Sequence, residues 1–186
     1  LEPTGYHLVN LGWHFLAAIL VWRLFERLSI PGAWFAAVVF ALHPVNVESV
    51  AWISQRKSVM AAGLFFGSLL SYFQWADGGR KKWFVVSLLL YALSLFSKPS
   101  AITGPFVILA LVWWHRRAIH KSDLKASVPF LGLSLVIGLV GVWFQAYRVI
   151  GPEAVRDDSF SARVAGAGYA LWFYLFKAVL PINLSF

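Results

Sequence analysis

The stretch ALHPVNVESVAWISQRKSVMAAGLFF places polar and charged side chains between two strongly apolar runs. A carboxylate can remove a proton from an acceptor hydroxyl, and cations can neutralise a phosphate leaving group. The residue types therefore indicate a group-transfer site for an anionic substrate, whereas the simpler alternative is a solvated helix on a membrane surface. The residues of this stretch that we consider for such a site are His43, Asn46, Glu48, Arg56 and Lys57.

We expect polar side chains from other parts of the chain to lie at the same side of the membrane as this stretch. Lys98 joins two apolar runs with almost no loop, and a charge at that depth needs water, a lipid headgroup or a carboxylate. His7, Asn10 and His14 fall on one face of the first helix, where they read sugar hydroxyls, line the cavity or bind a neighbouring helix. We predict Glu48 as a catalytic acid–base group. The predicted substrate-binding residues are His43, Asn46, Arg56, Lys57, Lys98, Arg148, His7 and Asn10.

Metal and cofactor chemistry has little support in the sequence. His7 and His14 lie two turns apart with no third ligand nearby, and cysteine is absent. A divalent metal stays open as a cofactor, as does pigment or haem ligation by His14, but no ligand set is visible. The net charge of +8 comes from basic residues scattered between apolar runs. This pattern argues against nucleic acid and favours anionic lipid or a phosphate-bearing substrate.

The elements that position these groups must be membrane helices. Only 13% of the residues are charged and 60% are hydrophobic, too few charges to cover a soluble domain. In a bilayer the backbone must satisfy its own hydrogen bonds, which requires helices. The apolar windows without Asp, Glu, Lys or Arg that could form these helices are Pro3–Trp22, Leu28–Val47, Ser58–Ala76, Trp83–Ser97, Pro99–His115, Ala126–Tyr147 and Val164–Phe176. We predict an all-α polytopic bundle with six membrane spans and a seventh segment that spans, re-enters or lies at the interface.

The loops predict the orientation of this bundle. Loops 23–32, 77–82 and 116–125 together carry nine basic residues against three acids, whereas the other loops carry six against five. Basic loops stay in the cytoplasm, so we expect the remaining loops on the outer side. Residues 43–58 are then predicted to form one short amphipathic helix on the outer surface, with Glu48 and Arg56 two turns apart.

Four stretches resemble a known family: GYHLVNLGWHFLAAILVW, FALHPVNVESVAWISQRKSVMAAGLFF, LSLFSKPSAITGPFVILALVWW and LFKAVLPINLSF. They look like the membrane half of the TMTC-like proteins, which are transmembrane and tetratricopeptide-repeat proteins related to protein O-mannosyltransferases. The most specific part is His-Pro-x-x-x-Glu-x-Val followed by Arg, which His43, Glu48 and Arg56 match. Lys98 matches the Ser-Lys-Pro turn.

The resemblance implies a GT-C-like glycosyltransferase, which takes a sugar from a polyprenyl phosphate carrier and passes it to a protein or glycan on the outer or lumenal face. It places the principal catalytic acid upstream of Leu1 and tetratricopeptide repeats downstream of Phe186. Residues 1–186 would then form a single transmembrane domain, a fragment of a longer chain. The expected location is a bacterial inner membrane, or the endoplasmic reticulum in a eukaryote, with the lipid-linked sugar and anionic lipid as partners.

A second interpretation is a non-catalytic membrane subunit, packed in a larger complex and holding lipid or pigment. The aromatic content of 17% supports it, and other membrane-protein subunits would be its partners. A transporter is a third interpretation. The sequence upstream of Leu1 discriminates the first two, because an acidic pair after an earlier span would favour the enzyme.

Overall fold

The structure is a computed structural model, and it describes residues 2–149 and 159–180. Within these ranges the chain forms helices and turns without a strand, so the predicted all-α class is confirmed. The α-helices are α1 (Thr4–Arg27), α2 (Ala33–Leu42), α3 (Val47–Ala51), α4 (Arg56–Gly78), α5 (Lys81–Ser97), α6 (Gly104–Arg116), α7 (Lys121–Phe144) and α8 (Phe160–Val179). Short 3₁₀ segments are η1 (Pro44–Asn46), η2 (Ile53–Gln55) and η3 (Pro99–Thr103), and a π-helical turn, η4 (Gln145–Val149), extends α7.

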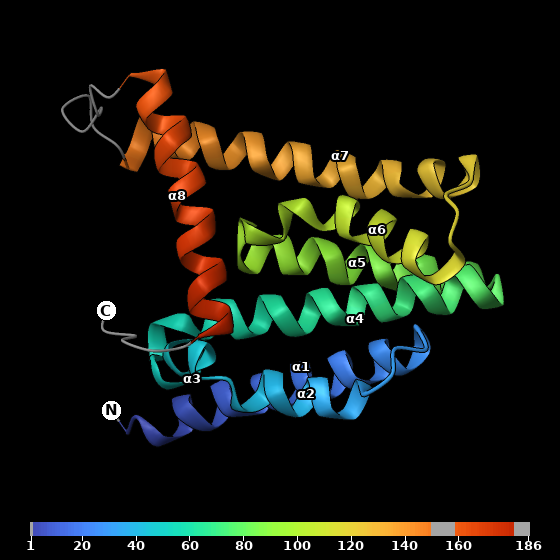
Figure 1. The fold of residues 1–186 in the computed structure, drawn as a ribbon, viewed down its shortest axis with the longest axis horizontal. Coiled ribbons are helices and arrows are strands. Elements are labelled where there is room, and N and C mark those ends of the chain that lie inside the picture. Colours follow the sequence, from blue (N-terminus) through green and yellow to red (C-terminus); the bar gives the residue numbers. More distant parts are fainter. Residues whose placement is uncertain (1, 150–158, 181–186) are drawn as a thin grey trace.

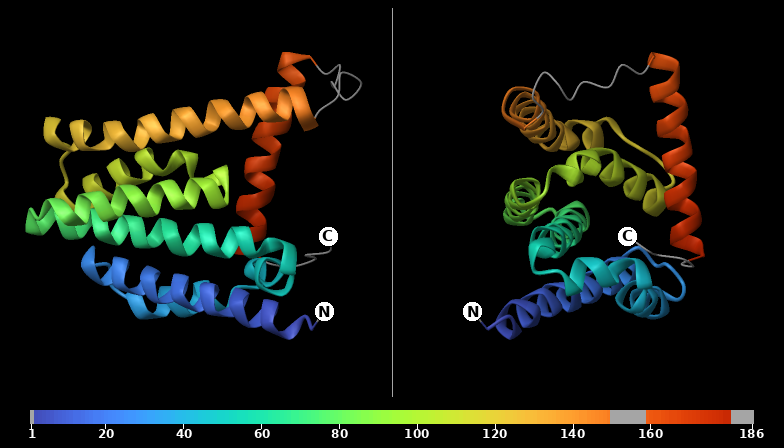
Figure 2. Two further views of the ribbon diagram at one scale, coloured as in Figure 1. Left: turned by 180° about the vertical axis from the view of Figure 1, so that it is seen from behind. Right: turned by 90° about the vertical axis from the view of Figure 1, so that its left-hand side faces the viewer.

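The long helices α1, α4, α5, α6 and α7 run along nearly the same direction (Figure 1). The hairpin of α4 and α5 lies at the centre, with α1 and α2 on one side and α6 and α7 on the other. Helix α8 crosses this common direction at the end of the bundle that holds α3 and the N-terminus (Figure 2). The bundle therefore has two distinct ends, and the short polar elements gather at one of them.

The central hairpin carries the core. Ser68 Oγ donates to the Ser87 carbonyl at 2.8 Å, and Ser87 Oγ donates to the Ser68 carbonyl at 2.8 Å. This exchange satisfies the buried hydroxyls where no water is present, which is how small polar residues join helices in membranes. The buried ring of Tyr72 on α4 meets Phe130 of α7 edge-on, with centroids 5.9 Å apart, so aromatic packing ties α7 to the hairpin.

Among the described residues, three helices are long and apolar enough to cross a membrane: α1, α4 together with η2, and α7. A fourth is added if α2 and residues 44–51, which are bent by 49° relative to each other, count as one span. Helices α5 and α6 have 17 and 13 residues and fall short of that length. The molecule is thus an α-helical membrane protein, but the predicted count of six or seven spans is not confirmed.

The second predicted window, Leu28–Val47, departs most from a simple span. Helix α2 has 10 residues, and their rise of about 15 Å crosses about half of a hydrocarbon core. The helix stops at Leu42 because His43 precedes Pro44 and takes an extended backbone, as residues before proline do. The polar stretch therefore begins with a break in a membrane segment.

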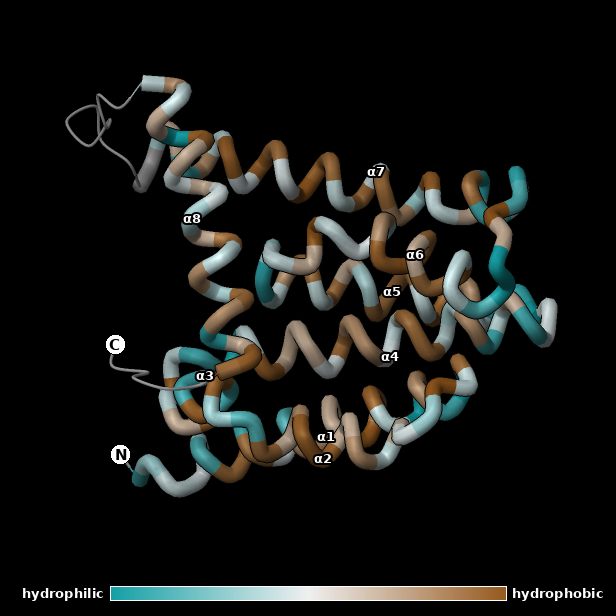
Figure 3. Tube along the Cα trace, in the orientation of Figure 1, coloured by the Kyte–Doolittle hydropathy of each residue, from teal (hydrophilic) through white to brown (hydrophobic). Residues whose placement is uncertain are grey.

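The predicted grouping of the loops is confirmed. Hydrophobic residues line the middle of the helices, and hydrophilic residues gather at the two ends of the bundle (Figure 3). The ends of α1, α4, α6 and α7 that border the basic loops meet through ion pairs of Arg27 with Asp77 at 3.1 Å and Arg116 with Asp123 at 3.2 Å. We call this the inner end and the opposite one, which holds α3, the outer end.

Candidate functional site

Side chains of the broken span, α2 with residues 44–51, stabilise its bend by hydrogen bonds. His43 Nδ1 accepts a hydrogen bond from the Val45 amide at 3.2 Å and so caps η1. Asn46 Nδ2 donates to the Phe40 carbonyl at 2.7 Å, which holds η1 against the last turn of α2. Both residues were predicted to bind substrate, and the structure gives each a role in shaping the turn.

Two residues of the polar stripe of α1, Asn10 and His14, form hydrogen bonds with backbone carbonyls near the break. The His14 ring nitrogen Nε2 lies 3.0 Å from the Ala41 carbonyl and must carry the proton there, because a carbonyl only accepts. Asn10 Nδ2 donates to the carbonyls of Val50 and Trp52 at 3.3 and 3.0 Å. Helix ends leave carbonyls without partners, and in a membrane these need a donor from the protein. The stripe therefore acts between helices.

Residues 43–58 do not form the single amphipathic helix that the sequence predicted. Helix α3 ends at Ala51, Trp52 has an extended backbone with ψ of 124°, and α4 begins at Arg56. At this break Asn10 of α1 donates to the carbonyls of Val50 and Trp52, and the Trp52 carbonyl also accepts from the Gln55 amide at 3.0 Å in η2. Glu48 and Arg56 consequently belong to different helices, and the spacing expected from one helix does not apply.

Glu48 lies in the first turn of α3 and is half-buried. Within the described ranges its carboxylate has no hydrogen bond or ion pair. Lys57 and His7 are exposed side chains near the same end of the bundle, and neither has a polar contact with another described residue. The predicted acid–base group is thus a carboxylate available to a ligand.

Arg56 begins α4 and turns toward α1. Its guanidinium lies over the ring of Tyr6, 4.9 Å from the centroid, which is a favourable cation–π distance. The Nε atom of Arg56 is buried and has no hydrogen-bond partner among the described residues. The cation is therefore held in place while part of its donor capacity stays unused.

Lys98 reaches the same turn of α4 from the junction of α5 and η3. Its Nζ donates to Ser58 Oγ at 2.9 Å, and Ser58 donates in turn to Gln55 Oε1 at 2.7 Å. Two cations thus lie at the first turn of α4: Arg56 belongs to that turn and contacts Tyr6 of α1, whereas Lys98 contacts Ser58. Their convergence on one anion stays a prediction.

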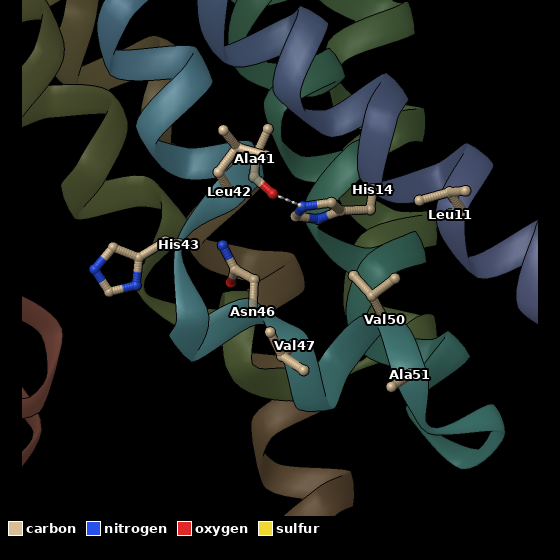
Figure 4. A pocket seen from close by; sticks show the side chains of 9 residues that line it. All are labelled: Leu11, His14, Ala41, Leu42, His43, Asn46, Val47, Val50 and Ala51. Carbon is tan, nitrogen blue, oxygen red and sulfur yellow. Dashed lines mark hydrogen bonds between the residues drawn. The ribbon is translucent and has the colours of Figure 1, made fainter. Parts of the chain in front are cut away.

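Two cavities flank this region. The first, about 230 Å³, lies between α1, the end of α2 and α3, and Figure 4 shows its lining side chains, with the His14 ring turned to the Ala41 carbonyl. The second, about 200 Å³, lies between α4 and η3 and receives Lys98, Ser58 and Thr103 among its lining residues. Both are smaller than a typical ligand pocket of about 300 Å³ or more.

The structure brings most of the predicted site residues to the outer end. Asn10 joins the broken span by its hydrogen bond to Val50, and Lys98 joins the first turn of α4 through Ser58. The side chain of Arg148, which was predicted to bind substrate, lies outside the described residues. In the described part of the chain, no three His, Asp or Glu side chains gather in a way that could hold a metal ion.

Sequence reasoning missed Tyr6 and Ser58, the contacts of the two cations. Tyr6, Asn10 and His14 recur every four residues, so the helical period could have added Tyr6 to the polar stripe. Ser58 carries no such signal, because its partner Lys98 is 40 positions away.

Fold and site together define an α-helical membrane protein that places a carboxylate on a broken span, and cations on neighbouring elements, at one end of the bundle. The chain is 34% identical over 194 residues to protein O-mannosyl-transferase Tmtc2 of Drosophila melanogaster, a match that covers 98% of this chain and 20% of the relative. It is 25% identical over 200 residues to protein O-mannosyl-transferase F38B6.6 of Caenorhabditis elegans, covering all of this chain and 27% of the relative. Identity to human protein O-mannosyl-transferase TMTC4 is 24% over 193 residues, 81% of this chain and 26% of the relative.

These similarities confirm the resemblance seen in the sequence, and the chain is TMTC-like. It spans only about a fifth to a quarter of the length of these relatives. No family model matches the chain. No solved structure matches it either.

Proposed function

We propose that residues 1–186 form the membrane domain of a GT-C-like glycosyltransferase, which passes a sugar from a polyprenyl-phosphate carrier to a protein or glycan at the outer face. The main support is similarity along nearly the whole chain to relatives named protein O-mannosyl-transferases. Mannose is therefore the first sugar to test. On this proposal the principal catalytic acid lies upstream of Leu1, and the domain works as part of a longer chain.

Glu48 is proposed to act on the acceptor or the sugar. A half-buried carboxylate without a partner among the described residues can accept a proton from a hydroxyl or orient it. Arg56 and Lys98 would neutralise the phosphate as the bond to the sugar breaks. His43 and Asn46 would contact the sugar from the turn that they shape. The remaining proposed contacts are Lys57, Arg148, His7 and, through its Oδ1, Asn10.

The proposed domain needs more spans than length and hydropathy alone assign. Helix α5 packs antiparallel along α4, so if α4 crosses the bilayer, α5 crosses most of it as well. Its 17 residues rise about 25 Å, against a core of about 30 Å. Counting α5, η3 with α6, and the bent pair as spans would give the six spans predicted from the sequence.

Glu48→Gln in the full-length protein tests the proposal. The change keeps shape and hydrogen bonding but removes the charge, so mannose transfer from polyprenyl-phosphate-mannose should fall about 100-fold, the usual scale for a positioned acid–base group. The melting temperature should hold, because surface changes without partners alter stability within about 0.5 kcal/mol. Both quantities are measured on the purified protein in detergent.

Glu26→Gln is the matched control. Glu26 is an exposed carboxylate at the inner end, where it pairs with Arg23 at 3.4 Å. Its replacement should leave transfer unchanged. A non-catalytic subunit would show no transfer above background, and equal rates in the two variants would remove Glu48 from the proposed mechanism.

A further inference from the structure

Helix α8 is unlike the other long helices. It has 20 residues, yet within the described part of the chain it is not among the helices apolar enough to cross a membrane. It runs across the common direction of α1, α4 and α7 at the outer end of the bundle (Figures 1 and 2). None of its residues is buried. The sequence left open whether this segment spans, re-enters or lies at the interface.

The two faces of α8 differ in chemistry. The helical period of 3.6 residues places the apolar face around Trp172 opposite the face that carries Tyr174. Apolar side chains on the first face are largely exposed: Trp172 by 73%, Leu175 by 56%, Phe176 by 52% and Val179 by 70%. The second face carries Arg163, Tyr174 and Lys177. An apolar face of this size is not stable in water and needs a cover.

The orientation of α8 relative to the membrane spans indicates what covers its apolar face. A helix perpendicular to membrane spans lies parallel to the plane of the bilayer, and α8 is at the end of the bundle, where that plane meets water. Aromatic residues favour this boundary, and basic residues on the opposite face suit anionic headgroups. We propose that α8 lies along the outer surface of the bilayer, with its Trp172 face among the acyl chains and its Tyr174 face toward headgroups and water.

This placement has a structural consequence. Because α8 crosses the end of the bundle that holds α3, this placement would set the membrane boundary near the level of the broken span, which carries Glu48. The inference does not depend on sugar transfer, and its test needs no activity.

Single-cysteine variants of the full-length protein test the two faces. Trp172→Cys and Tyr174→Cys form a matched pair, since the native side chains are 73% and 71% exposed but point to opposite faces. Each variant is labelled with bimane and reconstituted in vesicles of phosphatidylcholine and phosphatidylglycerol. We expect brominated lipid to quench the label at 172 and aqueous iodide to quench the label at 174.

A second pair tests the tilt. Gly168 and Val179 share the apolar face and lie about 16 Å apart along the helix axis. Labels at Gly168→Cys and Val179→Cys should report equal depth if α8 lies flat, whereas a spanning helix would put the label at 168 much deeper. The proposal is overturned by that depth difference, by iodide quenching at both 172 and 174, or by protection of both from lipid and iodide, which would mean a protein cover.

Discussion

The two polar ends of the bundle treat their charges in opposite ways. At the inner end, Arg116 bonds to Asp123 at 3.2 Å and to the Ala76 carbonyl at 2.9 Å, and Asp77 pairs with both Arg116 and Arg27. At the outer end, among the described residues, Glu48 forms no ion pair. Charges removed from water are stable only when well paired, so the inner network serves the architecture.

The contrast suggests where a ligand belongs. The outer end keeps its cations in place by a ring and a hydroxyl, which are neutral partners that leave the positive charge uncompensated. A phosphate could supply the missing negative charge. The difference between the ends predicts that inner substitutions change stability and that outer substitutions change ligand response.

The largest effect on stability is expected for Arg116→Met. Asp123 is only 6% exposed and would lose its ion pair, which should lower the free energy of unfolding by about 3 kcal/mol. Thermal unfolding in detergent measures this. Arg23→Met is the control, because the pair of Arg23 with Glu26 is exposed and contributes about 0–1 kcal/mol. Equal losses in the two variants would mean that the inner network does not stabilise the bundle.

A smaller loss, about 1–2 kcal/mol, is expected for Asn10→Leu. The change removes the Asn10 hydrogen bonds to the carbonyls of Val50 and Trp52, each worth about 1 kcal/mol, while the Trp52 carbonyl keeps the Gln55 amide as a donor. Part of this is offset, because Asn10 Oδ1 is itself buried without a partner in the described structure. Hydrogen exchange should rise at residues 47–55. His7→Leu, on an exposed position of the same helix, should change neither the stability nor the hydrogen exchange of residues 47–55. A matching effect there would refute the role of Asn10.

The smallest change in stability, under about 1 kcal/mol, is expected for Lys98→Met, which loses one hydrogen bond to Ser58. Its effect should appear with ligand. A ligand that binds only the folded state raises the melting temperature, so polyprenyl phosphate should stabilise the unaltered protein more than Lys98→Met. Lys125→Met, at an exposed cation of the inner end, is the control and should keep the full ligand shift. An unchanged ligand shift in Lys98→Met would separate Lys98 from the anion site.

Much of the fold follows from local composition. The predicted windows Ser58–Ala76 and Ala126–Tyr147 coincide with α4 and with α7 extended by its π-helical turn. The reason is that an apolar run in a bilayer can satisfy its backbone only as a helix. The tight turn after α4 was also predictable, because Gly79 adopts the left-handed conformation that ends helices.

Residue types alone pointed to the outer stretch as polar and chemically capable, and the grouping of the basic loops followed from their charge. Tertiary structure decided how that stretch is shaped. The helix expected over 43–58 is interrupted where Asn10 donates to Val50 from 40 positions away, and Ser58 meets Lys98 across the same separation. The tertiary structure also decided that Arg116, Asp77 and Asp123 neutralise one another, while Glu48 stays without a partner among the described residues. Such pairings depend on which helices lie side by side, and local sequence carries no record of that.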